Sequence, residues 1–360
     1  MSQYADRGKR ASLTNRISRI MWLSGVAILV AVSFAAPSAA RAATWRTCNG
    51  SPVIWRGGTD VHRNRCSIAD GGLANSAYWN GLDAWNRLAG AVTGFFVNGA
   101  SDCSISHGDG ENEVGLVDRT TIDGANGLTI LQLGPCFLGS NSIDEGDVMI
   151  ANDLPFTWVW GNFLGTTGRS TFVHEFGHFF GFNHDDTHAV MRTTPPHLVT
   201  GGAEPSTNWP RDTIGVSSVY GFLTSRPNLI ISSLGLSAGN LVQRLDPSIN
   251  VAICRGATRT TRVYVGNSGN VASGTYTLRV RLSPLAPPGG YTSGSTVVAT
   301  FSHAIGAFGE GTFDLPFTVP AGLSDGSYFI YVDMDSGNAV PEANEGDNTT
   351  VSSTLLSISC

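Results

Sequence analysis

Residues 174–184 read HEFGHFFGFNH, which fits the pattern H-E-x-x-H-x-x-G-x-x-H. His174 and His178 are four residues apart, so on a helix their side chains lie on one face, one turn apart. Gly181 predicts the end of that helix, because glycine adopts a positive φ without a Cβ penalty. The resulting turn directs His184 toward the same point, so the three imidazoles form a candidate ligand set for Zn2+.

Three protein ligands leave one coordination position open, which is typical of catalytic rather than structural zinc. Glu175 directly follows the first ligand and is the candidate general base for a bound water. Five specified positions match by chance in fewer than ~1 in 10⁴ chains of this length. The alternatives are a helix with solvated histidines and a zinc site without activity. On the helix face turned away from the histidines, an aromatic stripe is expected to pack in the core; it consists of Phe172, Phe176 and Phe179.

The motif resembles that of the metzincin metalloproteases, and among them the matrixin-like branch. Met191 follows the third histidine and resembles the Met-turn methionine that lies beneath the metal in that family; an ordinary core methionine is the alternative. Residues 144–150 resemble the edge strand that pairs with bound peptide, and residues 212–221 resemble the last helix with its terminal Tyr-Gly. Thr193 stands two residues after Met191, so the tyrosine ligand of other branches is not expected.

The resemblance implies an α+β metzincin-like zinc protease domain, with a mixed twisted sheet and three helices. Apolar periodicity favours helices near 74–88, 168–180 and 211–220, and strands at 113–117 and 147–150. The specificity pocket is expected to be walled by residues 193–209. Matrixin-like domains commonly bind calcium, so structural Ca2+ is a further expectation, with solvated carboxylates as the alternative. The candidate oxygen ligands are Asp109, Glu111, Asp118, Asp123, Asp144 and Asp153.

From about residue 225 the pattern changes to short strands separated by turns. Thr275–Leu282 alternates between apolar and polar positions, and about seven such runs predict an all-β immunoglobulin-like sandwich. Residues 227–230, 265–269 and 341–348 resemble pieces of the CARDB-type modules of bacterial adhesion proteins. The last piece is rich in turn formers and carboxylates, so a tight loop is expected there, with an ion site as the alternative.

The first 42 residues have the features of a secretory signal peptide. Basic residues precede an uncharged run, Ile20–Ala36, and Ala40-Arg41-Ala42 is an A-x-A-like cleavage site. At 17 residues the run is short for a permanent membrane anchor, which is the alternative. Cleavage near Ala42 gives three expected segments: 1–42 signal peptide, 43–224 zinc metalloprotease domain and 225–360 CARDB-like β-sandwich domain.

Charge and cysteine usage narrow the class of protein. The net charge of the whole chain is −6, and residues 1–42 hold six Arg or Lys against one Asp, so the remainder is near −11. This argues against nucleic acid or an anionic membrane as a partner. Six cysteines in an exported chain favour disulfides. Fifteen pairings are open, and the domain boundary narrows them because four cysteines precede it and two follow it. We expect Cys48–Cys66, Cys103–Cys136 and Cys254–Cys360.

Together these features predict a secreted, extracellular zinc metalloendopeptidase that acts on protein or peptide substrates. No stable membrane insertion is expected after the signal is cleaved. The sandwich is expected to attach the enzyme to a cell-surface or matrix ligand, an inference that rests on analogy. One alternative is an adhesion or binding protein with a vestigial zinc domain. Another is a zinc hydrolase that acts on something other than protein.

Overall fold

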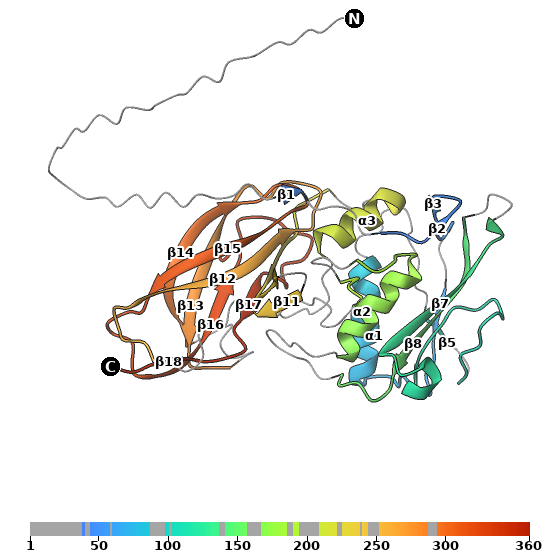
Figure 1. Ribbon diagram of the computed structural model, residues 1–360, viewed down its shortest axis with the longest axis horizontal. Helices are drawn as coiled ribbons and strands as arrows, with labels where there is room; N and C mark the ends of the chain where they lie inside the picture. The colour runs from blue at the N-terminus through green and yellow to red at the C-terminus, as the bar shows by residue number, and fades with distance from the viewer. Residues whose placement is uncertain are drawn as a thin grey trace, which may run out of the picture. The chain divides into compact units, whose positions relative to one another are not determined.

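A computed structural model gives the structure of most of the chain (Figure 1). It describes residues 44–57, 60–86, 103–136, 141–156, 167–185, 190–193, 209–221, 225–237, 240–243, 252–286 and 294–360. It describes only the backbone of residues 38–39, 86, 98–100, 234–237 and 240–243. Apart from the backbone of 38–39, the predicted signal peptide lies outside these residues, and its cleavage stays a prediction. The predicted boundary near 224 lies outside them too.

A mixed five-stranded sheet forms the N-terminal half, in the order β5-β4-β6-β8-β7. The first four strands are parallel, and β7 runs antiparallel to β8. The strands are β4 (Val61–Arg63), β5 (Asn98–Ala100), β6 (Glu113–Val117), β7 (Gly127–Leu133) and β8 (Ile143–Ala151). Smaller elements are the pair β2 (Thr47–Cys48) and β3 (Ser51–Pro52), and the 3-10 helix η1 (Arg119–Ile122).

Within the part of the chain that the structure describes, three helices accompany this sheet, at the positions expected from the sequence. They are α1 (Leu73–Asn86), α2 (Gly168–Phe179) and α3 (Pro210–Tyr220). The α2 helix begins after Thr167, whose hydroxyl accepts a hydrogen bond from the backbone N–H of Ser170 at 3.1 Å. The α3 helix begins with proline at its first position and ends at Gly221, where φ is 77°.

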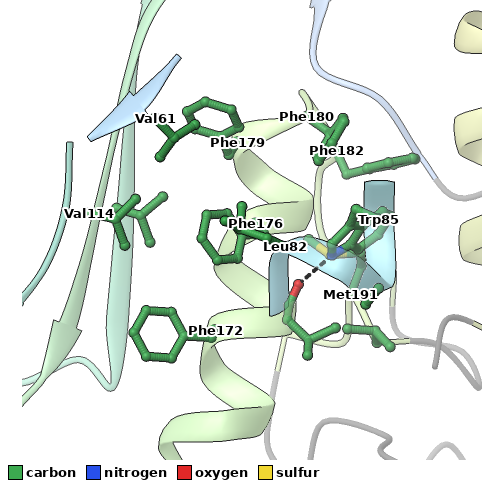
Figure 2. Close-up of a cluster of buried hydrophobic side chains, with 14 of the residues drawn as sticks. Val61, Leu82, Trp85, Val114, Phe172, Phe176, Phe179, Phe180, Phe182 and Met191 are labelled. Atoms are coloured by element: carbon green, nitrogen blue, oxygen red, sulfur yellow. Dashed lines mark hydrogen bonds between the residues drawn. The ribbon is translucent and has the colours of Figure 1, made fainter. Parts of the chain in front are cut away.

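The aromatic stripe of α2 occupies the centre of the N-terminal core, as the sequence predicted. Figure 2 shows Phe172, Phe176 and Phe179 on α2 between the sheet, represented by Val61 and Val114, and the side chains of α1. On the α1 side, Trp85 Nε1 donates a hydrogen bond to the carbonyl oxygen of Val173 at 2.7 Å. This packing fixes α2 in position and in rotation about its axis, so the opposite face presents the histidines in one orientation.

The expected position of the edge strand was wrong. Residues 144–150 lie in β8, which pairs with β6 on one side and with β7 on the other. Most positions of β8 are buried on both faces, which is typical of a central strand. The edge position belongs to β7, whose other side pairs with no strand in the described part of the chain.

The C-terminal half is a two-sheet β-sandwich, as the strand pattern predicted. One sheet has the order β1-β15-β12-β9, and the other has the order β14-β13-β16-β17, with β18 also paired to β16. The two inner faces enclose a second hydrophobic core that includes Val265, Leu278 and Ile330. The strands are β1 (Ser38–Ala39), β9 (Leu229–Ser232), β12 (Thr258–Asn267), β13 (Thr275–Ser283), β14 (Thr296–Ala304), β15 (Gly309–Thr318), β16 (Gly326–Asp333), β17 (Thr349–Val351) and β18 (Leu356–Ile358); a separate hairpin joins β10 (Leu234–Ser237) and β11 (Asn240–Gln243).

Three disulfides form, but only one of the expected pairs is correct. Cys254–Cys360 is confirmed, with its Cα atoms 5.0 Å apart. The other bonds are Cys48–Cys136 and Cys66–Cys103, with Cα separations of 5.4 Å and 5.3 Å. The expected pairing joined neighbours in sequence, whereas the fold joins neighbours in space. The side chain of Asn49, for example, donates to the carbonyl oxygen of Cys136 at 2.6 Å.

No helix within the described residues combines the length and the apolar composition that a membrane crossing requires.

Candidate metal centre

The Nε2 atoms of three histidines converge beside the C-terminal end of α2. Nε2 of His184 lies 3.2 Å from Nε2 of His174 and 3.1 Å from Nε2 of His178. Nδ1 of His174 faces the carbonyl oxygen of Val190 at 2.9 Å, and Nδ1 of His178 faces that of Phe182 at 2.8 Å. A carbonyl oxygen only accepts, so these two Nδ1 atoms carry the protons. Nε2 of His174 and of His178 therefore presents a lone pair to the common point.

This donor set fits a tetrahedral zinc ion. Three nitrogens at ~2.0–2.1 Å from such an ion lie about 3.3 Å from one another, close to the observed spacings. Lone pairs that face one another repel unless a cation lies between them. Burial lowers the pKa of His178 to about 4, which keeps the imidazole neutral, as a metal ligand must be.

The sharp turn after α2 and the segment at Thr44 together hold His184, the third candidate ligand. Gly181 adopts a φ of 99°, and a Cβ there would lie only 2.5 Å from the carbonyl oxygen of Val53. Beyond it, the backbone N–H of Asn183 donates to the carbonyl oxygen of Thr44 at 2.9 Å. The hydroxyl of Thr44 donates back to the carbonyl oxygen of His184 at 2.8 Å. No spacing in the sequence indicated this role for Thr44.

Glu175 is buried against the edge strand β7, with an exposed fraction of 5%. The hydroxyl of Thr129 lies 2.8 Å from Oε2 of Glu175 and 3.0 Å from its carbonyl oxygen. One hydroxyl proton therefore serves two acceptors of the same residue, and the carboxylate is held in one orientation. Burial raises the pKa of Glu175 to about 7, and the hydrogen bond from Thr129 opposes that rise.

Gly127 makes room for this carboxylate. It lies two residues before Thr129 on β7, so the two positions share one face of the strand. A Cβ at Gly127 would lie 2.6 Å from Cγ of Glu175 and 2.7 Å from its Oε1. The carboxylate thus occupies a niche formed by a glycine and a threonine, neither of which the motif indicated.

Met191 lies fully buried beneath α2 (Figure 2). Its Sδ atom occupies space that a side chain at Gly177 would need, since a Cβ there would lie 2.1 Å from the sulfur. Gly177 directly precedes the second histidine on the helix, so the methionine packs under the ligand-bearing turn. The carbonyl oxygen of Met191 accepts a hydrogen bond from the backbone N–H of Asp185 at 2.6 Å. Its role as the Met-turn methionine stays a prediction.

Asp212, in the first turn of α3, supports the segment that contains Met191. Its Oδ2 accepts hydrogen bonds from the backbone N–H groups of Val190 and Trp209, both at 3.0 Å. The carbonyl oxygen of Val190 in turn accepts from His174 Nδ1. Asp212 therefore fixes Val190, whose carbonyl oxygen orients the imidazole of His174. Burial raises the pKa of Asp212 to about 7, although both hydrogen bonds oppose the shift.

A second group of side chains that could hold a metal ion lies on β8 and in the loop before β6. Nδ1 of His107 is 3.4 Å from Glu145 Oε1 and 3.2 Å from Asp147 Oδ2. Both carboxylates are held by backbone N–H groups: Gly110, in the loop, donates to Glu145 Oε2 at 2.7 Å, and Glu113, at the start of β6, donates to Asp147 Oδ1 at 3.1 Å. Burial raises the pKa of Asp147 to about 6. The sequence analysis did not single out these three residues.

The six carboxylates named from the sequence as calcium ligands have other partners or lie apart. Asp153 forms an ion pair with Arg119, and Asp118 caps η1 through Thr120. Among the described residues, none of the six belongs to a group that brings three ligand atoms together. Most of the expected pocket wall, residues 194–208, lies outside the described residues.

Comparison with known proteins gives limited similarity. No protein-family model and no curated protein matches the chain. Solved structures that resemble it include the CARDB domain of a Pyrococcus furiosus protein in complex with di-metal ions, at 19% identity and a TM-score of 0.26. That match covers 37% of this chain and 90% of the other. A solution structure of the same domain gives 18% identity, a TM-score of 0.25, and coverage of 38% and 97%. The strand pairing, not these scores, supports the sandwich described above.

Proposed function

We propose that this chain is a secreted zinc-dependent endopeptidase of metzincin-like, matrixin-like architecture. In this proposal His174, His178 and His184 hold the metal, and Glu175 is the general base. The observation that carries the proposal is the convergence of three Nε2 atoms at 3.1–3.2 Å, with a buried carboxylate on the residue after the first ligand. The three helices, the mixed sheet and the buried Met191 support it.

The protein's own groups account for proton transfer during hydrolysis. Bound zinc would supply a Lewis acid for the scissile carbonyl and a water of lowered pKa. In this proposal the carboxylate of Glu175, which the hydrogen bond from Thr129 to Oε2 holds in place, takes the proton of the attacking water. The same carboxyl group then passes the proton to the leaving amine nitrogen. A pKa raised to about 7 suits Glu175 to accept and return a proton near neutral pH.

The edge strand β7 supports a peptide as substrate. An extended peptide adds a strand to an open sheet edge through main-chain hydrogen bonds, whatever its side chains. The carboxylate of Glu175 lies against the first residues of this strand, at Gly127 and Thr129. A peptide paired with the outer edge of β7 would therefore pass close to the general base. This geometry favours an endopeptidase over a hydrolase of small molecules.

Secretion and surface attachment complete the proposal. Three disulfides suit an oxidising compartment, and the predicted signal peptide at residues 1–42 suits export to it. The C-terminal sandwich is proposed to attach the enzyme to a cell-surface or matrix ligand in the manner of CARDB-type modules. The cleavage chemistry is assigned to the N-terminal half, which contains the three histidines and Glu175.

Cleavage of casein or gelatin by residues 43–360 tests the proposal. The protein is assayed as isolated, after chelation, and after zinc is restored, beside His178→Ala. We expect cleavage that is lost on chelation, recovered with zinc, and absent in His178→Ala. Tightly bound zinc without any cleavage would instead favour the alternative, an adhesion or binding protein with a vestigial zinc domain. A folded protein that binds no zinc would refute the metal assignment itself.

A further inference from the structure

One end of the sandwich contributes side chains to the core of the N-terminal half. On β9, Leu229 and Ile231 face the sandwich core, whereas Ile230 between them belongs to the N-terminal core. Tyr264, on the neighbouring strand β12, packs against the N-terminal core as well. The outer face of an antiparallel sheet is commonly solvated and polar. A buried apolar outer face therefore indicates a partner, and here the partner is the N-terminal half, which belongs to the same compact unit.

The start of α3 covers this face of the sandwich. The ring of Trp209, which precedes the helix, lies 5.5 Å from the ring of Tyr264 between centroids, at an angle of 64°. Pro210, the first residue of the helix, lies over Gly266, where a Cβ would be only 3.1 Å from Cγ of the proline. Gly266 pairs with Ile230 across the two strands, so both positions lie on the same face of the sheet. The contact is therefore continuous over β9 and β12.

An ion pair across the same contact joins Arg211 of α3 to Glu310, near the start of β15. Nε of Arg211 lies 3.1 Å from Oε1 of Glu310, and the side chain of Glu310 is only 3% exposed. Burial raises the pKa of Glu310, the charge of Arg211 opposes that rise, and the charge of Asp185 adds to it. Asp185 directly follows His184, the third candidate ligand. The ion pair therefore lies close to the candidate metal centre.

The first turn of α3 connects this contact to the group that orients the first candidate ligand. Asp212 directly follows Arg211, and its Oδ2 accepts a hydrogen bond from the backbone N–H of Val190 at 3.0 Å. The carbonyl oxygen of Val190 lies 2.9 Å from Nδ1 of His174. Asp212 and Val190 are fully buried, so little space is left for either to adjust. A shift of the helix start would therefore move the carbonyl group that fixes the imidazole of His174.

We propose that Glu310, on the sandwich, is a positioning residue for the candidate metal centre. Its ion pair with Arg211, together with the packing of the helix start on β9 and β12, holds the first turn of α3 in one place. Asp212 then holds Val190, and Val190 orients the imidazole of His174. The sandwich is thus a structural part of the enzyme, beyond any role in attachment. The consequence for zinc rests on the proposed function, whereas the coupling between the sandwich and α3 does not.

Hydrogen exchange of residues 43–360, followed by mass spectrometry of peptides, tests the coupling. The wild type is compared with Glu310→Gln, which keeps the shape of the side chain and removes its charge. Arg211→Gln changes the same ion pair from the other side, so the test does not depend on one variant that folds. Asp314→Asn is the matched control, because Asp314 lies on the same strand and pairs with Arg262 within the sandwich.

Breaking the ion pair should loosen one segment and leave the rest of the fold unchanged. We expect the backbone amides of residues 190–193 and 210–213 to exchange roughly tenfold faster in Glu310→Gln and Arg211→Gln than in the wild type. Exchange in β13 and β16, within the sandwich core, should stay the same, and Asp314→Asn should match the wild type throughout. Unchanged exchange at 190–193 in both variants, or an equal increase in β13 and β16, would overturn the inference.

The rate of zinc loss to a chelator, measured on the same proteins, separates this inference from the proposed function. We expect Glu310→Gln to lose zinc several-fold faster than the wild type and Asp314→Asn to lose it at the wild-type rate. Equal rates in the two variants would show that the coupling does not reach the metal centre and would overturn the positioning role. A wild type that binds no zinc would refute the proposed function, and the exchange experiment would still decide the coupling.

Discussion

Replacing Thr129 with valine should impair catalysis without disturbing the metal. The substitution keeps the branched shape and removes the hydroxyl that lies 2.8 Å from Oε2 of Glu175. A hydrogen bond to a charged group contributes about 1.5–3 kcal/mol. If that contribution is lost in the transition state, the rate falls by roughly tenfold to 100-fold. The lower figure is the safer expectation, because the hydroxyl also lies within hydrogen-bond distance of the carbonyl oxygen of Glu175.

The assay separates this positioning role from a structural one. Steady-state cleavage of a quenched fluorescent peptide gives kcat and KM for the wild type, Thr129→Val and Thr129→Ser, and bound zinc is measured on the same samples. We expect kcat to fall in Thr129→Val while KM and zinc content stay close to wild type, and Thr129→Ser to recover most of the rate. Thr350→Val is the control, since Thr350 is a buried hydrogen-bonded threonine in the sandwich. An unchanged kcat in Thr129→Val, with wild-type cleavage dependent on Glu175, would refute the reasoning.

Three further predictions concern packing, charge and covalent structure. Gly177→Ala should lower the melting temperature by several degrees, because overpacking against Met191 and Trp85 costs about 1–3 kcal/mol. Gly322→Ala is the control and should not lower it, because the space around Gly322 is open. Equal shifts in the two variants would contradict the packing described. The pKa of Asp212 is raised to about 7, so between pH ~4 and 7 the folded protein holds a proton that the unfolded chain has lost, and stability falls as pH rises through that window. The melting temperature of Asp212→Asn minus that of the wild type should therefore increase from pH 4 to pH 8. A difference that stays constant over this range would contradict the raised pKa. Non-reducing peptide mapping should recover Cys48 joined to Cys136 and Cys66 joined to Cys103, and recovery of Cys48 with Cys66 would contradict the fold.

The features that depend on residues close together in the chain were predictable. The helix that contains His174 and His178 follows from i, i+4 spacing, and its end follows from Gly181. The aromatic stripe at Phe172 and Phe176 follows from the same period. Strand alternation from Thr275 to Leu282 likewise indicated a half-buried strand in a sandwich. In each case one local period determines which side chains face the core.

Features that depend on pairing between distant segments were not predictable in the same way. Periodicity identified a strand near 147–150, but its place inside the sheet depends on β7, which folds back beside it. The niche around Glu175 depends on the register of that strand, which places Gly127 and Thr129 beside α2. The disulfides were misassigned for a related reason, because closeness in sequence does not measure distance in space. The same holds for Thr44, which reaches His184 across 140 residues.

The most direct test of the central claim measures bound zinc and the cleavage rate in the same preparations of wild type and Glu175→Gln. Glutamine keeps the shape of the side chain but cannot accept the proton of the attacking water. The account predicts one zinc per chain in both proteins, cleavage by the wild type, and a loss of several orders of magnitude in Glu175→Gln. Equal cleavage by both proteins, or a folded wild type without zinc, would contradict it.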